Sequence, residues 1–163
     1  STDKQTNMKE FADCIAFLQQ HHGPFDAIVA HSLGGTATLN AINQGVEIKK
    51  AVLIGSPGYI KNVVQDFCHR MGFKPFVEKH LIDYLKATYD EDFEQFSIPR
   101  LAEKMTIPAL IIHDEDDQDV SVIQAHQNHK AWKNSEYLET KGLGHRLILS
   151  DDDVIKRIVA FLT

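Results

Sequence analysis

The chain has 163 residues, a formal net charge of −6, and a composition that is 43% hydrophobic and 25% charged, which is typical of one soluble globular domain. No run of Lys or Arg forms a basic stripe, so a nucleic-acid partner has little support, and no apolar run approaches the ~20 residues that span a bilayer. Two cysteines are too few for a disulfide framework, so we expect reduced thiols and a cytoplasmic protein.

The first part of the chain alternates between helical and strand patterns. Apolar residues at helical spacing predict a helix over about 5–20, and the apolar run 26–30 predicts a short buried strand. Helical composition returns over 33–43, and the apolar run 51–54 predicts a second strand. The segment 59–104 differs, because it carries several helical patterns and no convincing strand, so we expect a helical insertion.

Strand and helix patterns alternate again after the insertion. Runs 108–112 and 135–139 predict two more strands, separated by a helix over about 119–133. Ser150, with Asp153 three residues later, predicts a capping box at the start of a final helix. The alternation predicts an α/β fold with a parallel sheet of about four strands flanked by helices, and active sites of such sheets gather at the carboxyl ends of the strands.

The run Ala-His-Ser-Leu-Gly-Gly lies between a predicted strand and a predicted helix. A sharp turn there would strain Ser32 and expose its hydroxyl group, and the small residues Ala30 and Gly34 on either side of the His31–Leu33 centre would let strand and helix approach. The amide of Leu33, at the helix N-terminus, could donate to a developing oxyanion. The alternative is a serine that merely caps a helix after a glycine-rich turn.

Two further candidates follow the later strands. An acidic run after the third strand contains five carboxylates between 114 and 119, with Asp117 favoured, and a glycine-flanked loop after the fourth strand carries His145. Taken alone, the acids could be a solvated loop and the histidine a surface residue. His126 and His129 could share one helix face as metal ligands do, yet no nearby cysteine completes a site, so we expect no metal.

Together these motifs resemble the α/β-hydrolase superfamily, from the helix before the nucleophile onward. The first resembles its G-x-S-x-G elbow with Ala30 in place of glycine, and the acidic run resembles its H-G-x-x-D-x-x-V segment with Asp114 in place of glycine. The resemblance implies Ser32 as nucleophile, Asp117 as the acid that orients the base, and His145 as the base, in the chain order of that family.

What the resemblance implies is a serine hydrolase of small carboxylic esters or thioesters, without a cofactor, working through an acyl-serine intermediate. Segments 1–58 and 105–163 would form the hydrolase core, with the family's N-terminal strands absent, and 59–104 a lid. Six aromatic residues of the lid could line the acyl pocket or form the lid's own core. These are Phe67, Phe73, Phe76, Tyr84, Tyr89 and Phe93.

The absent strands raise a second possibility. Strand 26–30 would lose one neighbour, and an apolar edge of that kind is expected to pair with another copy and give a homodimer. The alternative to an active enzyme is therefore a truncated, catalytically inactive fragment, or an interaction module that dimerises through this edge.

Overall fold

The computed structural model describes residues 8–89 and 92–163, and the part of the predicted first helix before Met8 lies outside them. The strands are β1 (Ala27–His31), β2 (Lys50–Ile54), β3 (Ala109–Asp114) and β4 (Ser135–Thr140). The helices are α1 (Met8–His22), α2 (Leu33–Asn43), α3 (Ile60–Arg70), α4 (Pro75–Thr88), the 3-10 helix η1 (Phe93–Phe96), α5 (Ile98–Ala102), α6 (Val122–Ala131), α7 (Gly144–Leu147) and α8 (Asp152–Leu162).

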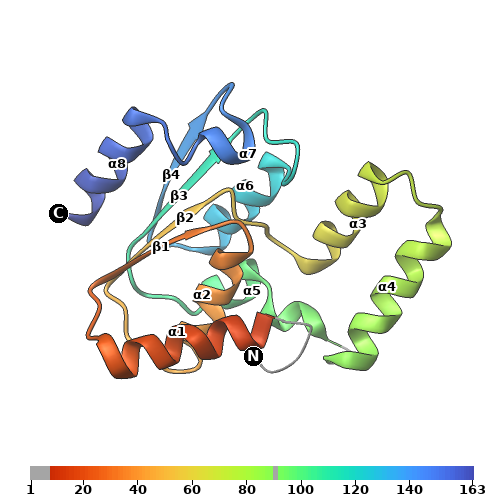
Figure 1. Cartoon of the computed structure of the whole chain (residues 1–163), viewed down its shortest axis with the longest axis horizontal. Helices are drawn as coiled ribbons and strands as arrows, with labels where there is room; N and C mark the ends of the chain where they lie inside the picture. Colours follow the sequence, from red (N-terminus) through yellow and green to blue (C-terminus); the bar gives the residue numbers. More distant parts are fainter. Residues whose placement is uncertain (1–7, 90–91) are drawn as a thin grey trace.

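The four strands form one parallel sheet in the order β1-β2-β3-β4, which confirms the predicted fold class (Figure 1). Every residue of β3 is buried, as are four of the five residues of β2, because helices cover both faces of the sheet. Within the described residues, β1 pairs on one side only, with β2. Since the strands are parallel, all four carboxyl ends meet at one edge of the sheet.

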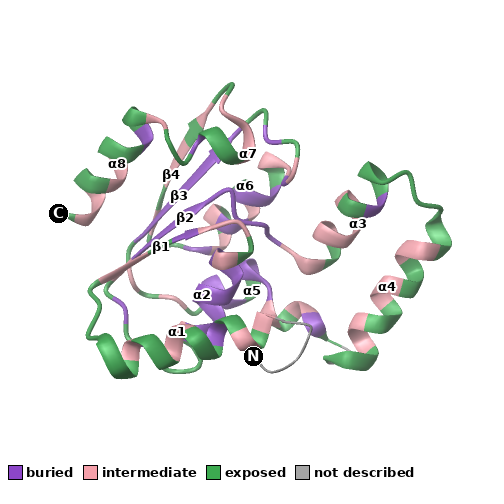
Figure 2. Ribbon diagram, viewed as in Figure 1, coloured by how far each residue is buried: buried purple, intermediate pink, exposed green. Residues whose placement is uncertain are grey.

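Successive residues of the central strands face opposite sides of the sheet and build two cores. On one side, Leu53 packs in a cluster with Leu39 of α2, Ile98 of α5 and Trp132. On the other side, a second cluster joins the sheet to the C-terminal helix, and its buried members are Val52, Ile54, Leu110, Ile112, Ile148 and Val154. Figure 2 shows this burial concentrated in β2, β3 and α2. The sheet edge that carries the loops is therefore held rigidly.

Helices α3 and α4 pack against each other and stand to the side of the sheet (Figure 1). Helix α4 has no buried residue, and α3 buries only Cys68. The prediction of helical structure between the second and third strands is confirmed for the described residues of that segment, which form α3, α4, η1 and α5 and no strand. No helix in the described ranges has both the length and the apolar character needed to cross a membrane.

The final helix begins differently from the prediction. Asp151 is its N-cap, and the Asp151 carboxylate accepts hydrogen bonds of 3.0 Å from the amides of Asp153 and Val154. The Ser150 hydroxyl group instead donates to the carbonyl oxygen of Leu147 at 3.0 Å. The predicted capping box is therefore wrong, because the neighbouring carboxylate is an equally favoured N-cap and lies one residue nearer the helix.

Candidate active site

Ser32 lies at a sharp turn between β1 and α2. Its backbone has φ 55° and ψ −131°, a combination that residues other than glycine rarely adopt, and it is the only described non-glycine residue with positive φ. The Ser32 amide donates to the carbonyl oxygen of Ile54 at the end of β2, over 2.9 Å, which fixes the turn to the sheet. The turn therefore holds the serine in the strained conformation that the sequence predicted.

The tightest packing behind this turn is at Gly35. A Cβ atom added at Gly35 would lie 2.2 Å from the Oγ atom of Ser56 and 2.7 Å from its Cβ atom. At Gly34 an added Cβ would meet only the Ala30 Cβ atom, at an ordinary 3.8 Å. The turn therefore requires glycine at position 35, which lies outside the G-x-S-x-G motif that the sequence resembles.

The structure brings Ser32, Asp117 and His145 together at the carboxyl ends of β1, β3 and β4. The His145 Nδ1 atom is 2.7 Å from Asp117 Oδ2, and the His145 Nε2 atom is 3.1 Å from Ser32 Oγ. Because the carboxylate can only accept, Nδ1 carries the proton, which leaves Nε2 free to accept from the serine hydroxyl group. The His145 side chain is 11% exposed, so solvent can reach the line of contacts.

Asp117 has its carboxylate buried and fully engaged. Its Oδ1 atom accepts from the amides of Asp119 and Val120 at 2.8 and 2.9 Å. Burial raises the pKa of Asp117, but hydrogen bonds from His113, Val120 and His145 outweigh burial and lower that pKa to about 2. The group is therefore an anion at neutral pH and can hold a protonated imidazole.

The other acids of the run have different surroundings. Glu115 and Asp116 are exposed, and Asp119 pairs with Arg70 of α3. Asp114 is buried, but its carboxylate contacts the loop before His145 and none of its contacts reaches the imidazole. Among these five acids of the described chain, Asp117 is the one whose carboxylate contacts the His145 ring.

His113 supports Asp117 from within the core. Its Nε2 atom lies 2.8 Å from the Val120 carbonyl oxygen and 3.3 Å from Asp117 Oδ2. Both partners are acceptors, so Nε2 carries a proton that it donates to them. Its Nδ1 atom is buried and has no hydrogen-bond partner among the described residues. In the sequence His113 is only the first residue of the segment that resembles H-G-x-x-D-x-x-V, and nothing local indicates its contact with Asp117.

His31 and Gly55 contact the site from the neighbouring strands. The His31 Nε2 atom donates to the carbonyl oxygen of His145 over 2.9 Å, and the two rings lie 4.6 Å apart between centroids. A Cβ atom added at Gly55, where φ is +56°, would lie 3.2 Å from His145 Nδ1. Sequence reasoning missed Gly55, and only its place directly after β2 could have indicated it.

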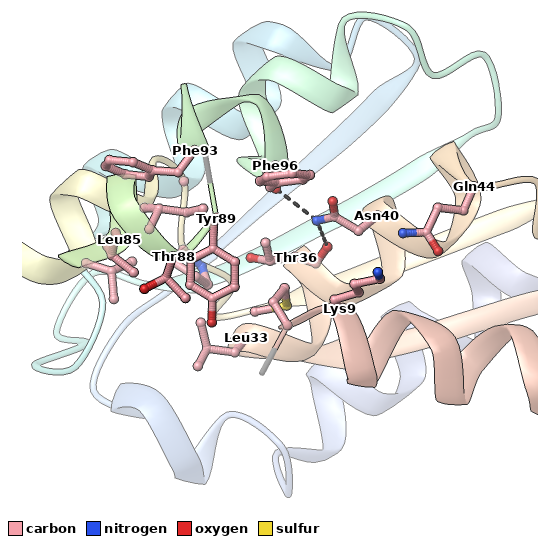
Figure 3. Close-up of a pocket in the computed structure, with 15 residues that line it drawn as sticks. Lys9, Leu33, Thr36, Asn40, Gln44, Leu85, Thr88, Tyr89, Phe93 and Phe96 are labelled. Atoms are coloured by element: carbon pink, nitrogen blue, oxygen red, sulfur yellow. Dashed lines mark hydrogen bonds between the residues drawn. The ribbon is translucent and has the colours of Figure 1, made fainter. Parts of the chain in front are cut away.

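Leu33 begins α2, so its amide has no carbonyl partner within the helix. That amide stands beside Ser32, where a helix N-terminus favours negative charge. A cavity of about 540 Å³ opens at the Leu33 side chain and runs between α2 and the helices of 60–96 (Figure 3). Its other wall-forming residues include Thr36, Asn40, Leu85, Thr88, Tyr89, Phe93 and Phe96.

Of the six aromatic residues considered as pocket lining, the structure places two in the cavity wall, Tyr89 and Phe93. The other four are not among the residues that line the cavity, and each is at least two-fifths exposed, although the rings of Phe67 and Phe73 pack edge to face with centroids 5.8 Å apart: Phe67, Phe73, Phe76 and Tyr84. For Phe76 and Tyr84, which are about three-fifths exposed, both alternatives were wrong, because helical periodicity does not say which face of a helix meets the core.

His126 and His129, the two histidines considered as metal ligands, each contact a different partner and do not share a binding site. His126 Nε2 contacts the Glu139 carboxylate at 2.9 Å, and His129 Nδ1 contacts the Ser135 hydroxyl group at 2.8 Å. Within the described ranges no group of three or more His, Cys, Asp or Glu side chains is arranged to hold a metal ion.

No protein-family model and no curated protein matches the sequence. Solved structures do match. An esterase domain from Rhodothermus marinus is 21% identical, with a TM-score of 0.66 over 96% of this chain. A meta-cleavage product hydrolase from Pseudomonas fluorescens is 14% identical, with a TM-score of 0.67 over 99%. An esterase from a Rhodococcus species is 15% identical, with a TM-score of 0.64 over 96%.

These three proteins share the α/β-hydrolase fold, and this chain has the same fold. The chain spans 66% of the length of the Rhodothermus esterase domain and 73% and 74% of the other two. At these identities the likeness establishes the fold alone, so any reaction must be argued from the residues of this chain.

Proposed function

We propose that this chain, which has the α/β-hydrolase fold, is a serine hydrolase that cleaves carboxylic esters or thioesters through an acyl-serine intermediate. The observation that carries the proposal is the continuous line of contacts from Asp117 through His145 to Ser32, with 2.7 and 3.1 Å between the paired atoms. These lengths are within the reach needed for proton transfer from a nucleophile to its base.

In this mechanism the Ser32 Oγ atom attacks the acyl carbon while its proton passes to Nε2 of His145. The Asp117 anion stabilises the imidazolium that forms, and the Leu33 amide donates to the oxyanion. The leaving alcohol or thiol takes the proton from His145 as the bond to the acyl carbon breaks. A water molecule then repeats the cycle on the acyl-serine, releasing the acid and restoring Ser32.

The cavity beside Leu33 is the proposed acyl pocket. Its volume of about 540 Å³ lies in the range of small-molecule sites, and its walls are mainly apolar. The core side of the cavity is lined by α2, the start of α1 and residues 57–58, and the other side comes from segment 59–104, which we propose acts as a lid over the pocket. A medium-sized apolar acyl group is the substrate that such a cavity favours.

Labelling with a fluorophosphonate probe, located by peptide mass spectrometry, tests the mechanism. We expect the label on Ser32, and we expect Ser32→Ala and His145→Ala to lose it. His126→Ala is the matched control, because that histidine lies on the surface with its side chain 53% exposed. A folded wild-type protein that takes no label at Ser32 would contradict the proposal.

We also propose, as a second property, that β1 pairs with β1 of another copy to form a homodimer. In the described chain β1 has one strand neighbour, and Val29 on it is 50% exposed. An unpaired apolar edge is a template for strand addition. Light scattering should give a dimer for the wild type and a monomer for Val29→Lys; a wild-type monomer at high concentration would exclude the pairing.

A further inference from the structure

Asp114, the last residue of β3, has a carboxylate that is fully buried and accepts four hydrogen bonds. Its Oδ1 atom accepts from the amides of Gly144 at 2.9 Å and Asp116 at 3.0 Å. Its Oδ2 atom accepts from the Thr140 hydroxyl group at 2.7 Å and the Leu143 amide at 3.1 Å. We call this group of contacts the Asp114 clamp.

The clamp holds the loop that presents the base. Thr140 ends β4, directly opposite Asp114 in the parallel register, and Leu143 and Gly144 lead straight to His145. The loop contains two glycines with positive φ, Gly142 at 80° and Gly144 at 61°, so its backbone is intrinsically permissive. Hydrogen bonds from Leu143 and Gly144 to the Asp114 carboxylate therefore select a path for the chain into His145, and the Gly142 amide adds a hydrogen bond of 3.0 Å to Asp116 Oδ2.

The same residue also holds the turn that presents the acid. The Asp116 amide donates to the Asp114 carboxylate, and the Asp117 amide donates to the Asp114 carbonyl oxygen at 3.1 Å. The positions of both Asp117 and His145 thus depend on Asp114, although Asp114 contacts neither the His145 ring nor Ser32. The aspartate stands where the resemblance to related hydrolases implies glycine, so this chain supplies the clamp with a side chain that glycine lacks.

The clamp is matched to an ionised carboxylate, because three of its four partners are backbone amides that can only donate and the Thr140 hydroxyl group donates as the fourth. Burial raises the pKa of Asp114, but the donors from Gly144, Thr140, Leu143 and Asp116 outweigh it and lower that pKa below its usual range. An asparagine of the same shape would turn its NH2 group towards at least one backbone amide, whichever way its side chain lies, because only the Thr140 hydroxyl group among the four partners can also accept.

We propose that Asp114 is a positioning residue, whose carboxylate fixes the loop residues Leu143 and Gly144 and the turn 114–117 so that His145 meets Asp117 and Ser32. This inference rests on the proposed hydrolase function for its effect on rate, but its effect on loop geometry stands without that function.

The test compares Asp114→Asn with Glu115→Gln in the full chain. Glu115 is the adjacent acid, is exposed, and pairs with Lys141, so the control removes one negative charge while leaving the clamp intact. We expect Asp114→Asn to slow fluorophosphonate labelling of Ser32 and kcat for an ester about ten- to a hundredfold, with KM changed by less than about threefold, because small misplacements of a base act on kcat. Glu115→Gln should match the wild type.

Nuclear magnetic resonance supplies a readout that needs no turnover. Asp114→Asn should speed amide hydrogen exchange at Leu143 and Gly144 by about tenfold or more while leaving β2 amides such as Val52 unchanged. It should also shift or remove the Nδ1 proton signal of His145, which is identified by its loss in His145→Ala. Equal acceleration at Val52 would mean general destabilisation and would overturn the proposal, as would wild-type kinetics and exchange in folded Asp114→Asn.

If Asp114→Asn does not fold, Thr140→Val decides the question, because it removes one donor and keeps the carboxylate. Labelling should then slow by about three- to tenfold, and wild-type labelling together with wild-type loop exchange would overturn the clamp. If wild-type Ser32 takes no label, the hydrolase function fails, and the exchange and Nδ1 measurements still decide whether Asp114 positions the loop.

Discussion

Replacing Gly35 by alanine should destabilise the fold sharply, whereas the same change at Gly34 should not. The added Cβ at Gly35 would lie 2.2 Å from Ser56 Oγ and 2.7 Å from Ser56 Cβ, and Ser56 is 3% exposed. The hydroxyl group could rotate away, but the Ser56 Cβ atom is fixed to the backbone. Overpacking of a rigid core typically costs 1–3 kcal/mol, and we expect about 3 kcal/mol here.

Gly34→Ala is the matched control, one residue earlier in the same helix. Its Cβ would meet only the Ala30 Cβ atom at 3.8 Å, so alanine should leave stability unchanged or raise it by up to about 1 kcal/mol through helix propensity. With about 2–4 °C per kcal/mol for a chain of this size, Gly35→Ala should lower Tm by about 6–12 °C.

Urea unfolding of the two variants and of the Gly35→Ala/Ser56→Gly double variant measures the effect. Removing the Ser56 side chain should recover most of the loss in the double variant, because the clash is a pairwise one. The reasoning would be refuted if Gly35→Ala and Gly34→Ala had the same unfolding free energy, or if the second substitution recovered nothing.

Three further outcomes are expected. The difference in unfolding free energy between the wild type and Asp117→Asn should be constant above about pH 5 and should fall by about 2 kcal/mol as the pH drops to about 2. The reason is that folding lowers the pKa of Asp117 from its ordinary value of 3.8 to about 2, so this stabilisation is lost as the carboxylate is protonated. Urea unfolding of both proteins at a series of pH values measures the difference. Gly55→Ala should lower kcat at least about tenfold, because the added methyl group would lie 3.2 Å from His145 Nδ1 and alanine is strained at a φ of +56°. Single-turnover ester hydrolysis measures the effect, and an unchanged kcat would contradict the placement of the His145 ring. Leu85→Trp should reduce hydrolysis of long-chain acyl esters more than that of acetyl esters, because Leu85 lines the cavity; a ratio equal to the wild-type one across a chain-length series would rule out this cavity as the acyl pocket.

Much of the fold could be predicted because the relevant signals are local. The apolar runs that became β1 to β4 are each bounded by turn residues, and their alternation with helical patterns permits little besides a parallel sheet. The bounds shifted by a few residues where pairing or capping decided them. For example, β3 extends to Asp114 because that residue pairs with Thr140 of β4.

The supporting residues of the site could not be predicted, because their roles depend on contacts between distant segments. Asp114 resembled one more member of a solvated acidic run, and only burial beside Leu143 and Gly144 distinguishes it. His113 and His31 are likewise common residues whose partners lie on other loops. Even the choice of Asp117 within five acids was settled geometrically, by the direction in which the turn points its carboxylate.

The sequence by itself determined the alternation of strands and helices and the order in which a serine, an acid and a histidine follow the strands, because both are written in local periodicity and chain order. Tertiary structure decided which carboxylate faces the imidazole, which glycine is sterically required and which aromatic residues reach the cavity. Those outcomes depend on how segments far apart in the chain pack, and a hydrogen bond or a clash is decided by ångström distances that no local pattern encodes.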